Sequence, residues 1–185
     1  DQENYQFAKN YLLEKLQLPF YVVPGRQDAA GSNLSQFVST FGSDFTKIDR
    51  DGTRFILLNS SLGNLRVSNP SQWRNLLQWM TECKADPKLE NLVVVNQAPL
   101  NITSSLSTEG SDSYEQDLLQ KQLTDVKESG KNVTYISSAA KGSTIKRRNG
   151  VSYIDTGYSS NPTCSLFGIN PAADGNPSIV VKFTP

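Results

Sequence analysis

The sequence predicts an α/β fold, with a sheet lying between layers of helices. Segments with apolar residues at helical spacing alternate along the chain with short apolar runs that are rich in β-branched residues. Two of these runs, 55–58 and 92–95, are continuously apolar, which is typical of strands that are covered on both faces. The 185 residues suit one compact domain with a sizeable core.

The first part of the chain is expected to form a helix, a strand and a second helix. Residues 4–16 carry apolar side chains at helical spacing, and Pro19 ends this helix. The run Phe-Tyr-Val-Val at 20–23 is typical of a short buried strand, which the Pro-Gly pair at 24–25 stops. The second helix is expected over 34–41, where it ends at the next glycine.

The middle of the chain begins with a hairpin signal. The strand-like runs 45–49 and 54–59 flank an Asp-Gly pair at 51–52, a typical hairpin turn. A helix is expected over 71–82, with Ser71 as its N-cap.

The last part of the chain predicts one more helix and several strands. A polar loop over 100–113 precedes an amphipathic helix over 114–128. A long proline-containing loop is expected over 158–177. The strands are expected at 133–136, 151–154 and 179–183.

The composition excludes several classes of function. The 18 basic and 18 acidic side chains leave no net charge that would favour nucleic acid or an anionic membrane surface. No apolar run approaches the roughly 20 residues of a membrane-spanning helix, so no membrane insertion is expected. Because the chain contains no histidine, Ser-His-Asp and Cys-His catalysis and histidine-bound metals are excluded. Two cysteines cannot form a Cys-rich zinc site.

The two cysteines, Cys83 and Cys164, leave two arrangements open. They are far apart in sequence, and a disulfide between them would close a long loop in an exported protein. The alternative is two separate thiols, since the sequence does not give the geometry that the bond requires.

Polar segments follow three of the expected buried strands. They are 24–28 (Pro-Gly-Arg-Gln-Asp), 96–99 (Asn-Gln-Ala-Pro) and 137–142 (Ser-Ser-Ala-Ala-Lys-Gly). In open α/β sheets, binding sites collect at the carboxyl ends of the strands. Each segment taken singly is typical of an ordinary turn, but their order along the chain is more specific.

This order resembles that of the calcineurin-like metallophosphoesterases. In that family, three strands end in Pro-Gly-Asn-His-Asp/Glu, in His-His-Pro and in Ser-Gly-His-x-His, and the Asn and His side chains hold two metal ions. This chain keeps the residues around these motifs at 20–25, 93–99 and 135–137. The hairpin over 45–61 and the helix over 71–80 lie between the first and second motifs, and the strand over 151–157 follows the third, as in the family. The resemblance covers residues 2–157 and implies a layered α/β sandwich with mixed sheets flanked by helices.

Every diagnostic ligand of the family is replaced, except for one carboxylate. Asp28 keeps the acid of the first motif. The other former site positions carry Arg26 in place of the ligand Asn, Gln27 in place of the catalytic His, Asn96 and Gln97 in the second loop, and Ala139 and Lys141 at the two His positions of the third loop.

The replacements argue against a metal centre and against catalysis. Paired divalent ions need several anionic or imidazole ligands at fixed positions. Alanine cannot ligate, and a Lys or Arg side chain would repel each divalent ion by on the order of 1–4 kcal/mol. We therefore expect no catalytic residue, no metal and no other cofactor, and a structural or protein-interaction role.

Two alternatives remain open. Arg26 and Lys141 could form a cationic cleft that binds a phosphate or carboxylate without cleaving it, although Arg26 could instead pair with Asp28 or another carboxylate. An enzyme with unusual ligands would have to use scattered carboxylates such as Asp28, Asp49 and Asp155. The basic run 146–148, before Asn-Gly, is most simply a solvated hairpin tip.

The resemblance also implies a setting for the chain. The family's Asp-x-His and Gly-Asp motifs are absent from this chain. Residues 1–185 are therefore expected to be a single domain that forms the larger, C-terminal part of the fold, without its N-terminal strands. Within it, 158–185 are expected to form a long loop and a final strand. Loops rich in Ser, Asn and Thr and a single methionine favour an extracellular or cell-surface protein. Its expected partners are other domains or subunits of a larger protein, not nucleic acid.

Overall fold

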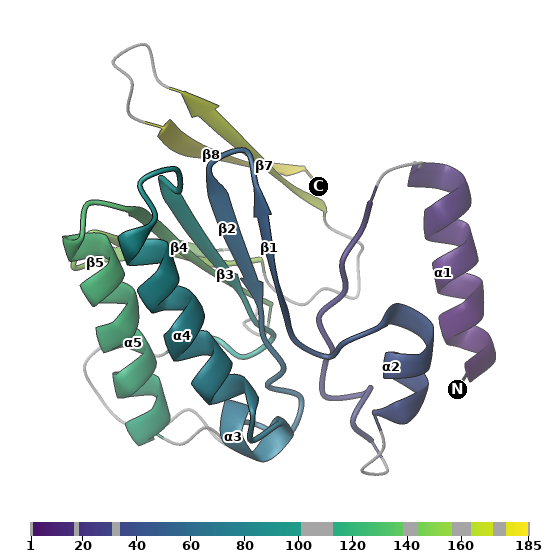
Figure 1. Ribbon diagram of the computed structural model, residues 1–185. Coiled ribbons are helices and arrows are strands. Elements are labelled where there is room, and N and C mark those ends of the chain that lie inside the picture. Colours follow the sequence, from purple (N-terminus) through teal and green to yellow (C-terminus); the bar gives the residue numbers. More distant parts are fainter. Residues whose placement is uncertain are drawn as a thin grey trace.

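A six-stranded mixed sheet forms the centre of the computed structural model, which describes residues 2–16, 19–30, 34–100, 113–138, 144–156, 164–171 and 177–184 (Figure 1). In spatial order the strands are β1 (Thr46–Arg50), β2 (Thr53–Leu57), β3 (Asn91–Val95), β4 (Asn132–Ser137), β6 (Val151–Asp155) and β5 (Thr144–Arg148). The helices are α1 (Gln2–Leu16), α2 (Ser35–Phe41), α3 (Leu65–Ser68), α4 (Gln72–Ala85) and α5 (Ser113–Glu128). The predicted α/β class is confirmed.

The inner strands are parallel and both edges of the sheet are antiparallel. β2, β3, β4 and β6 run in one direction, while β1 and β5 return alongside β2 and β6. Both edge strands are joined to their neighbours by two-residue turns with positive φ, Asp51-Gly52 and Asn149-Gly150. Positive φ at both positions is the geometry of the tight hairpin turns that Asp-Gly and Asn-Gly favour. The predicted hairpin at Asp51-Gly52 is confirmed. A second hairpin turns at Asn149-Gly150, but the basic run 146–148 belongs to the exposed strand β5 and not to the hairpin tip.

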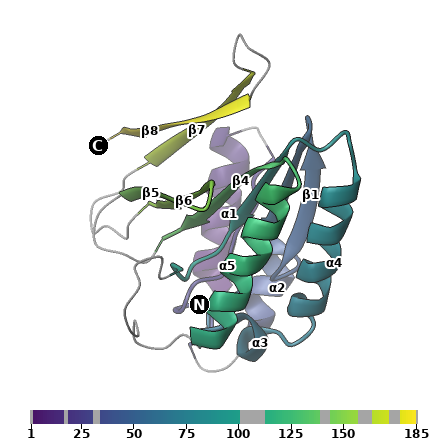
Figure 2. The same cartoon turned by 90° about the vertical axis from the view of Figure 1, so that its left-hand side faces the viewer.

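One face of the sheet is covered by α4 and α5, which lie side by side along the strands (Figure 2). Their apolar stripes fit the predicted helices, because Leu76 and Met80 of α4 and Leu123 and Val126 of α5 are almost fully buried. These side chains pack against a core that includes Ile56, Leu92, Val94, Val133, Tyr135 and Val151.

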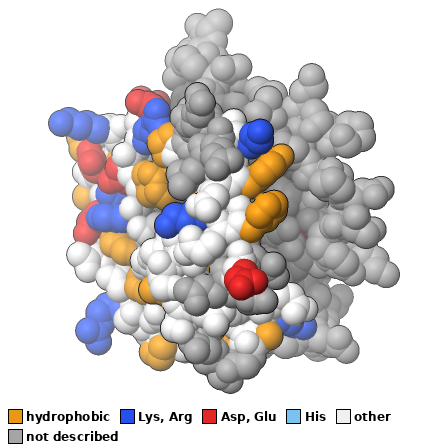
Figure 3. Space-filling model, turned by 90° about the vertical axis from the view of Figure 1, so that its right-hand side faces the viewer, with side chains coloured by type: hydrophobic (Ala, Val, Ile, Leu, Met, Phe, Trp, Pro, Cys, Tyr) orange, Lys and Arg blue, Asp and Glu red, His pale blue; other side chains and the backbone are white. Residues whose placement is uncertain are grey.

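α1 and α2 form a separate helical pair, to the right of the sheet in Figure 1. Tyr5 of α1 contacts Phe37 and Phe41 of α2 edge-on, with ring centroids 6.3 and 5.7 Å apart. The segment 19–25 runs between this pair and the sheet (Figure 1). The face that Figure 3 shows mixes hydrophobic with charged side chains.

The predicted strand over 20–23 is wrong. Residues 19–25 belong to no helix or strand, and Tyr21 is exposed. Pro19 and Pro24 remove amide donors at both ends of this segment, and the neighbouring sheet edge is formed by β1 in its tight pairing with β2. Apolar and β-branched composition alone therefore did not place the segment in the sheet.

Two further expectations are corrected. The loop expected over 158–177 contains β7 (Cys164–Pro171), which pairs antiparallel with β8 (Pro177–Thr184) in a two-stranded sheet of its own. Ser71 does not cap α4 with its side chain. Its backbone is already helical, and its amide and hydroxyl both donate to Asn69 Oδ1.

Cys83 carries a free thiol, buried on α4 against the sheet. Burial raises the pKa of this thiol, so the neutral form is favoured. The arrangement of separate thiols thus holds for Cys83. No helix in the described part of the chain is both long and apolar enough to cross a bilayer.

Candidate functional site

The carboxyl ends of the four parallel strands meet at one edge of the sheet, as the topology requires. The segment 96–99 follows β3 at this edge, and the turn 24–28 lies beside it. A Cβ atom built on Gly25 would lie 4.0 Å from Cγ of Gln97 and 3.5 Å from Oδ2 of Asp28. The structure therefore brings together the first and second of the three polar segments that the sequence singled out.

Asp28 holds the 24–28 turn in place. Its Oδ2 atom accepts a hydrogen bond from the Gly25 amide at 2.7 Å, and its own amide donates to Gly25 O at 3.1 Å. Its Oδ1 atom accepts from the Tyr5 hydroxyl of α1 at 2.6 Å. Burial together with the neighbouring Asp28 carboxylate raises the pKa of Tyr5 to about 12, so Tyr5 stays a donor at neutral pH. One carboxylate oxygen thus closes the turn, and the other ties it to α1 of the helical pair.

Arg26 and Gln27 are exposed at the tip of the same turn. The pairing of Arg26 with Asp28 that the sequence left open is not formed, because the Asp28 oxygens accept from Tyr5 and Gly25 instead. Arg26 takes part in none of the salt bridges between described residues.

Asn96 belongs to a buried hydrogen-bond network around Tyr135. Its Nδ2 donates to the Tyr135 hydroxyl at 2.9 Å, and its Oδ1 accepts from the Gln97 amide at 3.0 Å. The Tyr135 hydroxyl in turn donates to Ala98 O at 2.7 Å, and the Ala98 amide donates to Ser60 Oγ at 3.0 Å. Tyr135 is 1% exposed, and this burial raises its pKa above the ordinary value for tyrosine.

A second buried pair joins the ends of β4 and β6. Ser137 Oγ donates to Asp155 Oδ2 at 2.8 Å, and both groups are buried. The Thr156 amide and hydroxyl donate to Ser137 O at 2.8 and 3.1 Å. The Asn96 amide also donates to Ile136 O, which links the end of β3 to β4. The polar groups at this edge are therefore largely bonded to one another.

The scattered carboxylates do not assemble into one site. Asp28 and Asp155 lie at the carboxyl edge, but Asp49 pairs with Arg54, the second residue of β2, and so lies toward the opposite end of the sheet. Within the described ranges, no three His, Cys, Asp or Glu side chains are placed so that they could hold a metal ion. Ala139 and Lys141 fall outside the described residues, so their roles stay predictions.

Sequence reasoning missed several members of this edge, namely Tyr5, Ser60 and Tyr135. Their only sequence signal is position, because Ser60 follows the end of β2 and Tyr135 lies in the second half of β4. Tyr5 lies 23 residues before the carboxylate that it contacts, and no local pattern connects the two.

Comparison with known proteins finds likeness in structure but no match among protein families or curated proteins. A solved structure described as GAP50, the anchor in the inner membrane complex of Plasmodium, is similar, with a TM-score of 0.52 and 18% sequence identity. The match covers 76% of this chain and 49% of the GAP50 chain, so this chain matches about half the length of that structure. At this identity the likeness shows the α/β fold alone.

Proposed function

We propose that this chain is a non-catalytic, metallophosphoesterase-like domain with a structural or protein-binding role in a larger, exported protein. The observation that carries the proposal is the bonding at the carboxyl edge. The Asp28 carboxylate bonds with Tyr5 and Gly25, Asn96 with Tyr135, and Asp155 with Ser137. A metal centre or a reacting group at this edge would compete with these contacts for the same oxygen and nitrogen atoms.

The order of elements supports the family part of the proposal. A turn with the Pro-Gly-x-x-Asp pattern, a hairpin, a helix and parallel strands follow one another, and the first two polar segments lie side by side. At the family's ligand positions in these two segments stand Arg26 and Gln97, whose side chains make poor metal ligands, and Gln27 stands in place of the catalytic His.

The similarity to GAP50 supports the role and the setting. GAP50 is described as the anchor in an inner membrane complex. By analogy, this chain would serve as a scaffold that other subunits or domains contact, at a surface or membrane-associated location.

A titration with metal ions and a generic phosphodiester tests the proposal. We expect calorimetry with Mn²⁺ and with Zn²⁺ to show no site of micromolar affinity, and bis(4-nitrophenyl) phosphate to be hydrolysed no faster than in buffer with the same metal. Micromolar binding with turnover would overturn the proposal. The variant Asp155→Asn serves as the matched control, because any real site at this edge would lose affinity when that carboxylate is neutralised.

Anion binding is the second candidate, and the exposure of Arg26 favours it. An exposed guanidinium outside any described salt bridge can bind phosphate through charge-assisted hydrogen bonds. If this candidate is right, the double variant Arg26→Gln, Lys141→Gln loses affinity for inorganic phosphate. Unchanged phosphate affinity in that variant would rule it out.

A further inference from the structure

A cavity of about 480 Å³ lies between the helical pair and the sheet, and none of its lining residues belongs to the carboxyl-edge network. Its apolar wall comes mainly from the 19–25 segment, α2 and the end of β2, through Phe20, Val22, Phe41 and Leu57. Lys9 of α1 and Thr40 of α2 add polar groups to the lining. Volumes of about 300–1,000 Å³, mostly apolar with a few polar groups, are typical of small-molecule sites.

Lys9 brings a positive charge to this cavity and forms no described salt bridge. Its Nζ atom donates to the backbone oxygen of Thr40 at 2.7 Å. Lys9 is half-buried and takes part in none of the salt bridges between described residues. An ammonium group has three donors, so two remain for an anionic ligand.

Thr40 provides a second, independent sign of a ligand. The residue is 2% exposed, and its hydroxyl is a buried side-chain polar atom with no hydrogen-bond partner among the described residues. Buried hydroxyls are nearly always satisfied, because leaving one unpaired is unfavourable. A ligand acceptor that binds Lys9 would lie next to Thr40, whose hydroxyl has no hydrogen-bond partner among the described residues.

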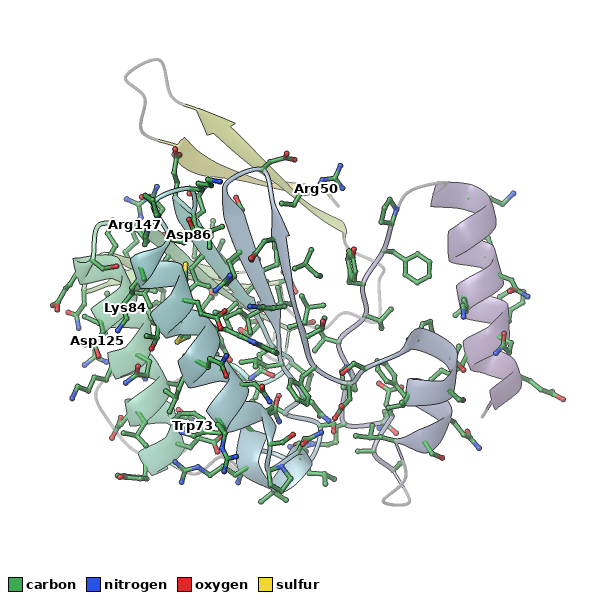
Figure 4. All side chains as sticks on the ribbon, in the orientation of Figure 1. Arg50, Trp73, Lys84, Asp86, Asp125 and Arg147 are labelled. Carbon is green, nitrogen blue, oxygen red and sulfur yellow. The ribbon has the colours of Figure 1, made fainter. Side chains whose placement is uncertain are left out.

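A second cavity of about 320 Å³ extends the apolar surface along the sheet. It shares Tyr21 and Leu57 with the first cavity and is otherwise lined by apolar side chains, with Arg50 as the exception. Arg50 projects from the end of β1 on the side where the 19–25 segment runs (Figure 4). The two cavities together offer a polar end at Lys9 and Thr40 and a longer apolar part.

We propose that these cavities bind a single-chain amphiphile with a carboxylate head, that is, a medium-chain fatty acid. The carboxylate accepts a hydrogen bond from Lys9 Nζ and, once rotation of the Thr40 side chain brings its buried hydroxyl to the cavity, a second from that hydroxyl, while the chain lies against Phe20, Val22 and Leu57. Such a site shares no lining residue with the carboxyl-edge network and does not depend on the function proposed above.

Calorimetric titration of the full chain with decanoate, below its micelle concentration, tests this proposal against decanol as the uncharged ligand. We expect saturable binding of decanoate that is at least about tenfold tighter than that of decanol, since a hydrogen bond to a charged group is worth about this factor or more. Lys9→Met removes this preference, and Lys15→Met, on the same helix but outside the cavity lining, keeps it.

Two further variants keep the test decisive if Lys9→Met weakens the packing of α1. Thr40→Val preserves shape and weakens decanoate binding several-fold without affecting decanol. Val22→Trp, in a segment outside the helices and strands, fills the first cavity and abolishes binding of both ligands. Absence of saturable decanoate binding, equal affinity for the two ligands, or unchanged decanoate affinity in both Lys9→Met and Thr40→Val would overturn the proposal.

Discussion

Arg54 shows how a single buried charge is accommodated in this fold. Only 4% of the residue is exposed, and its guanidinium donates twice to the Asp49 carboxylate, at 2.7 and 2.6 Å. It also donates to Trp79 O and to Glu82, which links β2 to α4. All of these partners are acceptors, so the buried cation is compensated from both the neighbouring strand and the covering helix.

Replacing Arg54 with methionine is expected to lower the free energy of unfolding by about 1–3 kcal/mol. Removing one partner of a buried ion pair costs several kcal/mol, but the carboxylates left behind here are partly exposed, which reduces the cost. Urea denaturation measures the change. The control Arg50→Met breaks an exposed pair with Asp51 and should cost less than about 0.5 kcal/mol. Equal costs for the two variants would contradict this role of Arg54.

The same cluster makes stability depend on pH. The hydrogen bond from Arg54 lowers the pKa of Asp49 below its ordinary 3.8, and the hydrogen bonds from Lys47 and Gln78 lower that of Glu82 below 4.5. Because these pKa values are lower in the folded chain, the stabilisation is complete above the ordinary values and is lost as the pH falls through the folded ones. As the pH is lowered past about 4.5, we expect the urea concentration at the unfolding midpoint to decrease. The decrease should be smaller in Arg54→Met. An identical pH dependence in both proteins would show that the cluster does not contribute.

Tyr135 tests whether the carboxyl edge is closed by hydrogen bonds. In Tyr135→Phe, the Asn96 amide group loses an acceptor in buried surroundings, and Ala98 O loses a donor in partly buried ones. We expect a loss of about 1–3 kcal/mol in the free energy of unfolding. The exposed Tyr11→Phe is the matched control, expected to change little. No loss in Tyr135→Phe would mean that water replaces these bonds readily and that the edge is open.

At the scale of elements, the two hairpin turns define the edges of the sheet. Gly52 has φ +70°, a conformation that side chains with a Cβ adopt at a cost, and Asp51 before it has φ +48°. Gly52→Ala is expected to lower the free energy of unfolding by about 1–2 kcal/mol. Asp51→Asn should stay within about 0.5 kcal/mol, because asparagine favours the same turn. Thermal unfolding of both variants checks this, and a neutral Gly52→Ala would argue against the turn as described.

Sequence patterns predicted the elements that local residues determine. The helices over 72–85 and 113–128 and the strands on either side of Asp51-Gly52 follow from periodicity and turn residues alone. The strand over 20–23 was predicted wrongly because strand pairing depends on which strand forms the edge of the sheet. Local composition does not determine this, and the edge is formed by β1. The strand β7 was missed because prolines near it are typical of loops.

At the scale of the whole molecule, the position of the site was partly predictable and its bonding was not. Gln97 lies beside the turn that holds Asp28, at the edge that the order of strand-end segments indicates. The hydrogen-bond partners of Asp28 and Asn96 come from distant parts of the chain. Tyr5 lies 23 residues from Asp28, and Tyr135 lies 39 residues from Asn96. Only the packing of α1 and of β4 brings these partners into contact, so no local motif indicates them.

The central claim is that the carboxyl edge satisfies its own polar groups and does not hold metal ions. Thermal unfolding of the chain with and without millimolar Mn²⁺ tests it most directly, because any ligand that binds the folded state raises its stability, by about 2.7 kcal/mol at a hundred times its dissociation constant. We predict the same unfolding temperature in both conditions. An increase with Mn²⁺ that disappears in Asp155→Asn would contradict the claim.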